Sequence, residues 1–421
     1  MDSFPSQTSP FHEKQRRRHI VTISIAVGVI LLGVLSVALY LRSQKTGILV
    51  LDPTTDIVIK LNGRTTVPQQ TDRGLYLPVY AGQYRIELDK TGYLPFVQDI
   101  KTTAGTILNI RPAFTLTPTV QEATGDSLDF VRPSANEKSI YYLGDYRQRL
   151  FRLEVSNQTT VPLTDNPLTR VVDVEWGSDP DVALIVQTDG TYLHEIPRFD
   201  FQNQIYVKIG GPEIVSPMWD PNNPDRIAAA YFPSSGEQSL VVADQRFTAI
   251  TRLASLQGIP SPKILWSPNS DYILLMGRSA DPAQENLWLY TLASGQVQQL
   301  TQGGSVHNAL FSPDSTRILF ETQDSQGKTS QSLLTLNGDT VQPLNDTLPL
   351  TQVAWKNATS YYEVSADHQS LILHNLDGTQ ETTSLSLGST EAIQTLFYYA
   401  QPSKVIITTK GAVYTVNLEK N

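Results

Sequence analysis

Residues 263–270 read KILWSPNS, and residues 307–315 repeat the pattern as HNALFSPDS. In both copies an apolar run ends in an aromatic residue, and a Ser-Pro pair followed by Asn or Asp comes next. Proline presets its φ angle and an Asn or Asp side chain bonds to nearby backbone, so this sequence is typical of a tight turn. A second apolar run follows at once, at residues 272–276 and 317–320. Each copy therefore predicts a β-hairpin.

The aromatic residue that ends the first run recurs along the chain. Its positions lie 42 to 47 residues apart, at Phe130, Trp176, Trp219, Trp266, Phe311, Trp355 and Phe397. The best copy continues with a third predicted strand at residues 286–292 and an outer strand at residues 296–301, which gives four strands in a repeat. A period of this length built from short strands is the pattern of propeller blades. The sequence predicts an all-β chain with a seven-bladed β-propeller. A six-bladed ring and a large two-sheet sandwich are the alternatives.

The predicted propeller covers residues 115–421, and its last repeat is one strand short. Residues 115–121 read TLTPTVQ, which resembles the outer strand TTVPL at residues 159–163 of an earlier repeat. An open ring would leave sheet edges that invite aggregation. We therefore expect residues 115–121 to complete the last blade and close the ring.

Residues 20–41 form an uncharged, predominantly apolar segment of 22 residues. About 20 apolar residues in a helix span the hydrocarbon core of a bilayer, so the segment predicts a single transmembrane helix. Four Lys and Arg residues precede it, and the positive-inside rule then places residues 1–19 in the cytoplasm and the bulk of the chain outside it. The small residues around Ala38 also fit a cleavage site, so a removed signal peptide is the alternative to a signal-anchor.

The composition excludes several classes of site and partner. The 421 residues include no Cys, which excludes disulfides, thiolate metal sites and a cysteine nucleophile. Residues 46–421 carry 26 Lys and Arg against 39 Asp and Glu. A domain that acidic repels phosphate backbones, so we expect no nucleic-acid partner.

Residues 46–114 predict a separate small β-sandwich, because short alternating runs are separated by turns such as Asn62-Gly63. LPVYAGQYRI at residues 77–86 and KTGY at residues 90–93 resemble the layout of the PEGA domain family. The eponymous Pro-Glu-Gly-Ala is replaced by PVYAG at residues 78–82. The resemblance implies a surface-exposed bacterial or archaeal β module without catalytic residues.

The repeats themselves resemble the TolB-like propeller family, which also occurs in prolyl-oligopeptidase-type enzymes. The residues that carry the likeness are WSPNSDYI at 266–273 and FSPDSTRI at 311–318. The resemblance implies a WD-repeat-like propeller, and such repeats specify a fold far more reliably than a function.

The sequence shows no constellation that indicates catalysis. It lacks the Gly-x-Ser-x-Gly elbow and the following α/β domain of an oligopeptidase-type hydrolase. His307, His368 and His374 have no ligand-like spacing, and the oxygen-rich turn at residues 220–225 does not match an EF-hand loop. We therefore predict no catalytic residue, no cofactor and no metal site, and we expect the protein not to be an enzyme.

A ligand of a propeller is expected at the face lined by the loops between second and third strands. The longest of these loops are residues 232–238, 278–285 and 322–330. The candidate rim residues are Arg278, Asp281, Gln284, Asp324, Gln326 and Lys328.

Two function classes follow from these observations. The first, which we favour, is a membrane-anchored module of the cell envelope that binds a protein or peptide or acts as a scaffold. The second is an enzyme or enzyme subunit, hydrolase-like, with a site at the propeller mouth. The absence of clustered Asp, Glu and His in the loops argues against the second class.

Overall fold

The computed structural model divides the chain into two compact units, which meet in the sequence between Phe114 and Thr115. It describes residues 27–37, 39–40, 44–51, 56–122, 128–133, 139–154, 159–177, 182–188, 194–260, 262–278, 285–302, 305–324, 326–336, 340–344, 349–387, 391–400 and 403–418.

Residues 27–37 and 39–40 are helical. Within the described part of the chain, no helix is both long enough and apolar enough to cross a membrane. The predicted tail 1–19 lies outside the described residues, as do residues 20–26, 38 and 41 of the predicted membrane segment.

The smaller unit contains two four-stranded sheets around one core. One sheet has the order β4-β5-β1-β8 and the other the order β3-β2-β6-β7. The strands are β1 (Lys45–Val50), β2 (Ile57–Leu61), β3 (Arg64–Thr66), β4 (Gln69–Thr71), β5 (Gly74–Tyr80), β6 (Gly82–Lys90), β7 (Phe96–Thr102) and β8 (Ile107–Ile110). Alternate residues such as Ile57, Ile59 and Leu61 are buried, because a strand with one covered face needs apolar side chains at every second position. Tyr93 is only partly buried, and its ring packs against Phe114.

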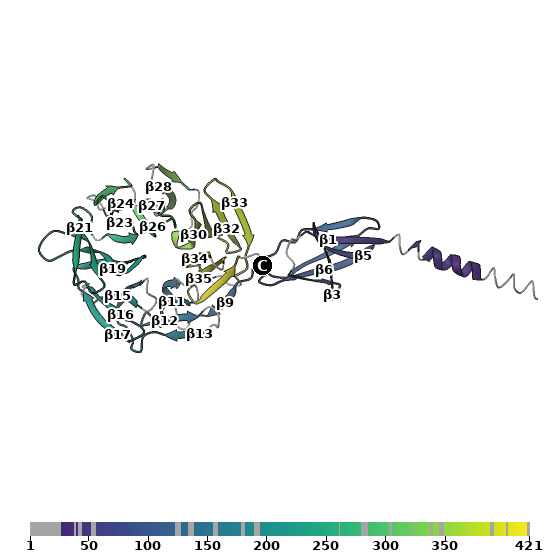
Figure 1. The fold of residues 1–421 in the computed structure, drawn as a ribbon, viewed down its shortest axis with the longest axis horizontal. Helices are drawn as coiled ribbons and strands as arrows, with labels where there is room; N and C mark the ends of the chain where they lie inside the picture. The colour runs from purple at the N-terminus through teal and green to yellow at the C-terminus, as the bar shows by residue number, and fades with distance from the viewer. Residues whose placement is uncertain are drawn as a thin grey trace, which may run out of the picture. The chain divides into compact units, whose positions relative to one another are not determined.

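The larger unit is built from antiparallel four-stranded groups placed around a ring (Figure 1). The first three groups are β10 (Asp129–Pro133), β11 (Ser139–Gly144), β12 (Arg149–Glu154) and β13 (Thr159–Pro162); β14 (Val171–Trp176), β15 (Val182–Thr188), β16 (His194–Asp200) and β17 (Ile205–Gly210); and β18 (Ile214–Asp220), β19 (Asn223–Tyr231), β20 (Ser239–Asp244) and β21 (Ile250–Ser255).

The next two groups share one eight-stranded sheet, and a bridge between Glu285 and Ser305 joins their halves. They are β22 (Lys263–Trp266), β23 (Tyr272–Arg278), β24 (Glu285–Thr291) and β25 (Gln296–Gln299), then β26 (Ser305–Phe311), β27 (Arg317–Gln323), β28 (Thr329–Thr335) and β29 (Thr340–Pro343). After the short 3₁₀ helix η1 (Leu350–Gln352) come β30 (Val353–Asn357), β31 (Ser360–Val364), β32 (Ser370–Asn375) and β33 (Gln380–Ser384).

The last group takes its fourth strand from the start of the unit. β34 (Thr395–Ala400), β35 (Ser403–Thr408) and β36 (Ala412–Asn417) pair in order, and β9 (Thr119–Glu122) adds to β36 with Val120 opposite Tyr414. The strand therefore begins four residues later than expected for residues 115–121. Leu116 bonds instead to the neighbouring sheet, where its backbone N–H donates to the carbonyl oxygen of Ser384 at 2.9 Å.

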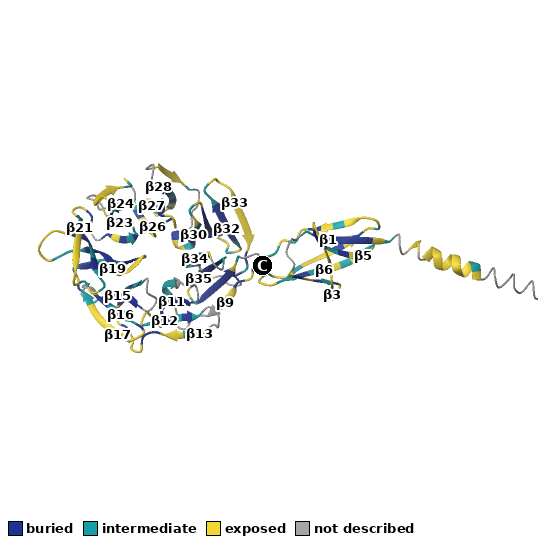
Figure 2. Ribbon diagram, viewed as in Figure 1, coloured by how far each residue is buried: buried dark blue, intermediate teal, exposed yellow. Residues whose placement is uncertain are grey.

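Burial follows the position of each strand in its group. β11, β15 and β31 are buried along almost their whole length because both faces of each second strand contact other sheets. The fourth strands β13, β17 and β33 lie at the periphery and are mostly exposed (Figure 2). Ile140 and Tyr142 share a core cluster with Ile406 and Val413, so the first and last groups pack directly together.

The repeated Ser-Pro turn is held by its own side chains. Ser267 Oγ donates to Asn269 Oδ1 at 2.7 Å and accepts the Tyr272 N–H at 3.0 Å, and Ser312 Oγ repeats both bonds with Asp314 and Arg317. Successive turns are also linked, because Asn269 N–H donates to Ser315 Oγ at 3.1 Å. The turns between first and second strands therefore join neighbouring groups on one face of the ring.

Two of the recurring tryptophans join their group to the one before it. Trp176 Nε1 donates to the Phe130 carbonyl oxygen at 2.8 Å, and Trp266 Nε1 donates to the Met218 carbonyl oxygen at 3.1 Å. Trp219 occupies the same place at the end of β18, yet its Nε1 has no hydrogen-bond partner among the described residues. Both Trp219 and Trp266 are only 5% exposed.

This difference gives a matched pair of substitutions. Trp266→Phe removes an indole N–H that is bonded, whereas Trp219→Phe removes one that is not. We expect Trp266→Phe to lower the free energy of unfolding by about 1 kcal/mol more than Trp219→Phe, the net worth of one buried hydrogen bond. Urea unfolding of the full chain, followed by tryptophan fluorescence, measures this, because all five Trp residues lie in the larger unit. Equal losses would contradict the assigned role of the indole N–H.

Candidate functional site

The innermost strands of several groups line an open cavity of about 700 Å³. These strands are β10 of the first group and β26, β30 and β34 of the last three groups. Its wall is mainly apolar, and the lining residues include Val131, Ala309, Leu310, Leu350, Ala354, Leu396, Phe397 and Tyr398. A concave, mostly apolar site of this size with a few polar groups is the usual form of a ligand site.

The strands around the ring depart from regular pairing at similar places. The register of β14 shifts between Val171 and Asp173, and that of β26 shifts between Val306 and Asn308. Counted back from the aromatic anchors Trp176 and Phe311, the extra residue stands four positions earlier in both strands. A bulge bends its strand and redirects side chains, and bulges are frequent beside functional sites.

Four charged side chains from three groups interact inside the ring. Asp173 and Glu175 belong to β14, Arg132 to β10 and Lys263 to the start of β22. The pKa of Glu175 is raised to about 8, chiefly by burial and also by the neighbouring Asp173, while Arg132 and Lys263 partly offset both effects. Burial also raises the pKa of Asp173, although a hydrogen bond of 2.9 Å from the Val174 N–H to its carboxylate lowers that pKa in part.

Arg132 links this charged cluster to the apolar cavity. Its guanidinium is part of the cavity lining, and its Nη1 donates to the carbonyl oxygen of Trp176. Burial lowers the pKa of Arg132, although Glu175 acts in the opposite direction. The cavity and the adjoining charged cluster together form the central channel. Its largely desolvated guanidinium and its carboxyl with a pKa near 8 leave it able to bind a charged group of a ligand.

Sequence reasoning missed Arg132, Asp173 and Glu175. Arg132 lies in β10 and the two acids lie in β14, so the cluster forms only when different repeats meet. The signal was the pair of acidic residues at alternate positions in VVDVEW at residues 171–176, where Val174 and Trp176 are buried.

The structure separates the predicted rim residues. Arg278 lines a second cavity of about 410 Å³ together with Lys263 and His307. Its Nε lies 3.6 Å from Glu285 Oε1. Asp281 and Gln284 lie outside the described residues.

The other three rim residues form a self-contained turn. Asp324 Oδ1 accepts the backbone N–H groups of Gln326 at 2.9 Å and Lys328 at 2.8 Å. The Asp324 carboxylate thus holds its own loop in place, and none of the three lines the cavity beside Arg278.

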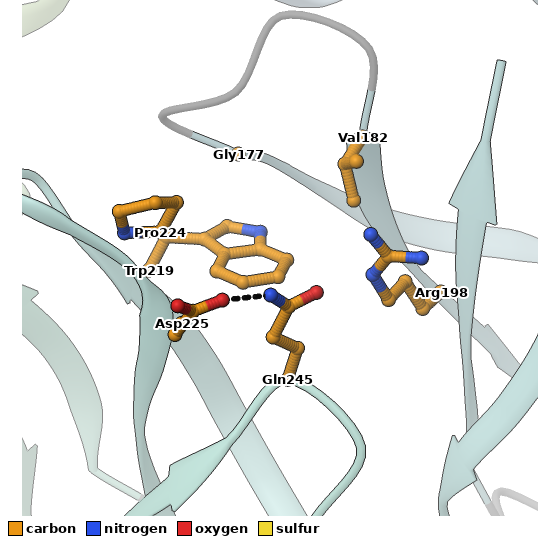
Figure 3. Close-up of a pocket in the computed structure, with 7 residues that line it drawn as sticks. All are labelled: Gly177, Val182, Arg198, Trp219, Pro224, Asp225 and Gln245. Carbon is orange, nitrogen blue, oxygen red and sulfur yellow. Dashed lines mark hydrogen bonds between the residues drawn. The ribbon is translucent and has the colours of Figure 1, made fainter. Parts of the chain in front are cut away.

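A third cavity, of about 150 Å³, lies between the second and third groups (Figure 3). Gln245 Nε2 donates to Asp225 Oδ1 on one side, and Trp219 and Arg198 face the opening from the others. Its volume suits a few water molecules better than an organic ligand.

His368 and His374 belong to one group of the ring and His307 to the group before it. His368 lies in the turn before β32 and His374 within that strand, where its Nε2 is 2.8 Å from Glu363 Oε2. Across the part of the chain that the structure describes, no group of three or more His, Cys, Asp or Glu side chains could hold a metal ion.

No family model and no curated protein matches this chain. Similar solved structures include TolB from Acinetobacter baumannii, with a TM-score of 0.41 and 11% identity over 86% of this chain and 80% of that one. The β-propeller domain of Myceliophteria thermophila Cps50 (Swd1) has a TM-score of 0.49 and 12% identity over 72% of this chain and 100% of its own. An oligogalacturonate lyase in complex with manganese has a TM-score of 0.45 and 10% identity over 80% of this chain and 83% of its own. At these values the likenesses carry no argument about activity.

The raised pKa of Glu175 predicts a pH-dependent stability. Its folded value of about 8 lies above the ordinary 4.5, so the folded chain retains a proton that the unfolded chain releases. The free energy of unfolding contributed by this group therefore falls as pH rises from about 4.5 through about 8. Glu175→Gln stays neutral, and we expect its stability relative to the parent chain to rise by more than about 1 kcal/mol between pH 5 and pH 9.

Urea unfolding at the two pH values measures this difference. Glu381→Gln, on the exposed outer strand β33, is the control, and its difference from the parent chain should stay constant. If the free energy of unfolding of Glu175→Gln, relative to the parent chain, is the same at both pH values, the Glu175 carboxyl is solvated.

Proposed function

We propose that the larger unit binds an extended peptide segment of a partner protein in its central channel, within a membrane-anchored scaffold of the cell envelope. The observation that carries the proposal is the apolar cavity of about 700 Å³ with Arg132 in its wall. A folded domain is too large for that space, whereas a few consecutive residues of a chain can enter it.

The chemistry of the wall favours a segment with apolar side chains and one carboxylate. Leu310, Leu396 and Phe397 offer apolar surface from two strands, and desolvation of such surface is the main favourable term in peptide binding. The guanidinium of Arg132 suits a side-chain or terminal carboxylate, since its planar donors match two oxygens. The acidic balance of residues 46–421 disfavours a nucleic acid as the partner.

The remaining parts of the chain fit the same role. The larger unit is proposed as a seven-bladed ring, supported by the successive four-stranded groups and the pairing of β9 with β36. The smaller unit, with its two sheets, would act as a PEGA-like spacer. Residues 20–41 would anchor the chain, with residues 1–19 in the cytoplasm; support for this comes from the sequence pattern alone.

Peptide selection tests the channel. Peptides are selected from a random display library on the full chain, and the best sequence is synthesised for calorimetric titration. We expect Leu310→Gln to raise the Kd at least about tenfold, because it replaces apolar wall with an amide that must be desolvated. Val341→Gln changes an exposed apolar residue on outer strand β29 of the same group and should leave the Kd unchanged. If both substitutions change the Kd equally, the peptide does not bind in the channel.

The absence of cysteine allows a direct test of orientation. Single cysteines are introduced as Ser6→Cys, before the apolar segment, and as Thr382→Cys, on exposed strand β33. In intact bacteria that express the chain, a membrane-impermeant maleimide should label Thr382→Cys at once and Ser6→Cys only after the cells are permeabilised. The reverse order, or no labelling of either cysteine before permeabilisation, would contradict the proposed topology.

A further inference from the structure

A serine, a histidine and a glutamate lie close together near Arg278, and the histidine and the glutamate line the cavity there. Ser305 Oγ lies 3.3 Å from His307 Nε2, and His307 Nδ1 lies 3.6 Å from Glu285 Oε2. The imidazole thus faces a hydroxyl with one nitrogen and a carboxylate with the other. This is the arrangement in which a base activates a nucleophile while an acid orients the base, and such distances are often loose before substrate binds.

The fold explains why these three residues converge. Glu285 begins β24 and Ser305 begins β26, and the two residues pair directly in a parallel bridge between neighbouring groups. His307 follows two residues later, where the register of β26 shifts between Val306 and Asn308. The bulge therefore places the imidazole beside the hydroxyl of its own strand and the carboxylate of the preceding group.

His307, Glu285 and Val306, the residue after Ser305, line a cavity of about 410 Å³ that has an apolar part and a cationic part. Pro260, Met276 and Val306 contribute the apolar surface, while Lys263 and Arg278 contribute positive charge. Glu285 is part of the wall and approaches both Arg278 and His307. The cavity therefore suits a small acyl group that carries an anionic substituent.

We propose that Ser305, His307 and Glu285 form a hydrolytic site for small carboxylic esters that bear an anionic group. This activity goes beyond peptide binding in the central channel, and its three reacting residues take no part in that binding. Ser305 is the nucleophile, His307 is the general base and then the general acid, and Glu285 is a positioning residue that stabilises the imidazolium.

The reaction balances with water as the only co-reactant. Ser305 Oγ attacks the ester carbonyl carbon and its proton passes to His307 Nε2. The bond to the alcohol oxygen then breaks, and His307 returns the proton to the leaving alkoxide. Water, deprotonated by His307, attacks the acyl-serine, which releases the carboxylic acid and restores the Ser305 hydroxyl. Lys263 and Arg278 bind the anionic substituent of the ester.

A fluorophosphonate probe on the purified full chain tests the nucleophile. We expect covalent labelling that peptide mapping assigns to Ser305, and Ser305→Ala should abolish it. Ser330→Ala is the control, because Ser330 is an exposed serine of the same sheet whose hydroxyl pairs with Thr322 and not with an imidazole. No labelling of the parent chain, or equal labelling of Ser305→Ala, would overturn the proposal.

Ester hydrolysis tests the base and the substrate class. His307→Gln should lower kcat/KM for p-nitrophenyl acetate by about 100-fold, the usual range of general-base catalysis. Glu285→Gln should give a smaller loss in the same direction. Arg278→Gln should raise KM for mono-(4-nitrophenyl) succinate by a larger factor than KM for the neutral acetate ester. If His307→Gln hydrolyses both esters as fast as the parent chain, the proposal fails, whatever the outcome for peptide binding.

Discussion

Each sheet of the larger unit has two apolar faces, and the need to cover both determines the rest of the structure. β11, β15 and β31 are buried along nearly their whole length, so a sheet cannot stand with one face in water. Placing every sheet between two others satisfies this requirement only if the row closes on itself. The shared core of Ile140 and Tyr142 with Ile406 and Val413 is that closure, and β9 covers the edge of β36 at the same place.

Closure has a consequence for chemistry, because it brings the first strands of distant repeats into one enclosed space. Arg132 and Glu175 are separated by 43 residues in the sequence, yet they influence each other's pKa. Burying charged groups is unfavourable unless they are paired, and here the opposite charges of Arg132 and Lys263 only partly offset the burial of Glu175. A packed interior selected for stability alone would not keep such a group, so these residues point to a functional channel.

The sequence predicted the local structure better than the sites. The Ser-Pro turns at residues 267–271 and 312–316 were identified correctly, because a turn is specified by residues adjacent in the chain. The closing strand was placed less well, since β9 begins at Thr119 and not at Thr115. The charged cluster and the contacts of His307 could not be predicted, because they depend on the register between repeats. That register is set by bulges, and no periodicity in the sequence encodes them.

A serine, a histidine and an acid meet at the β24–β26 interface but not at the interface before it or the one after it. His307 lies four positions before its aromatic anchor, where the preceding group has Pro262 and the following group has Thr351. Ser305 lies six positions before the anchor, where these groups have Pro260 and Pro349. At the start of the third strand, the place of Glu285 is taken by Ser239 and Thr329. The scaffold therefore offers equivalent positions at each of these interfaces, and only the β24–β26 interface carries a base, a hydroxyl and a carboxylate together. A side-chain combination that the backbone geometry does not require needs its own explanation, and the cationic cavity beside it supplies a chemical one.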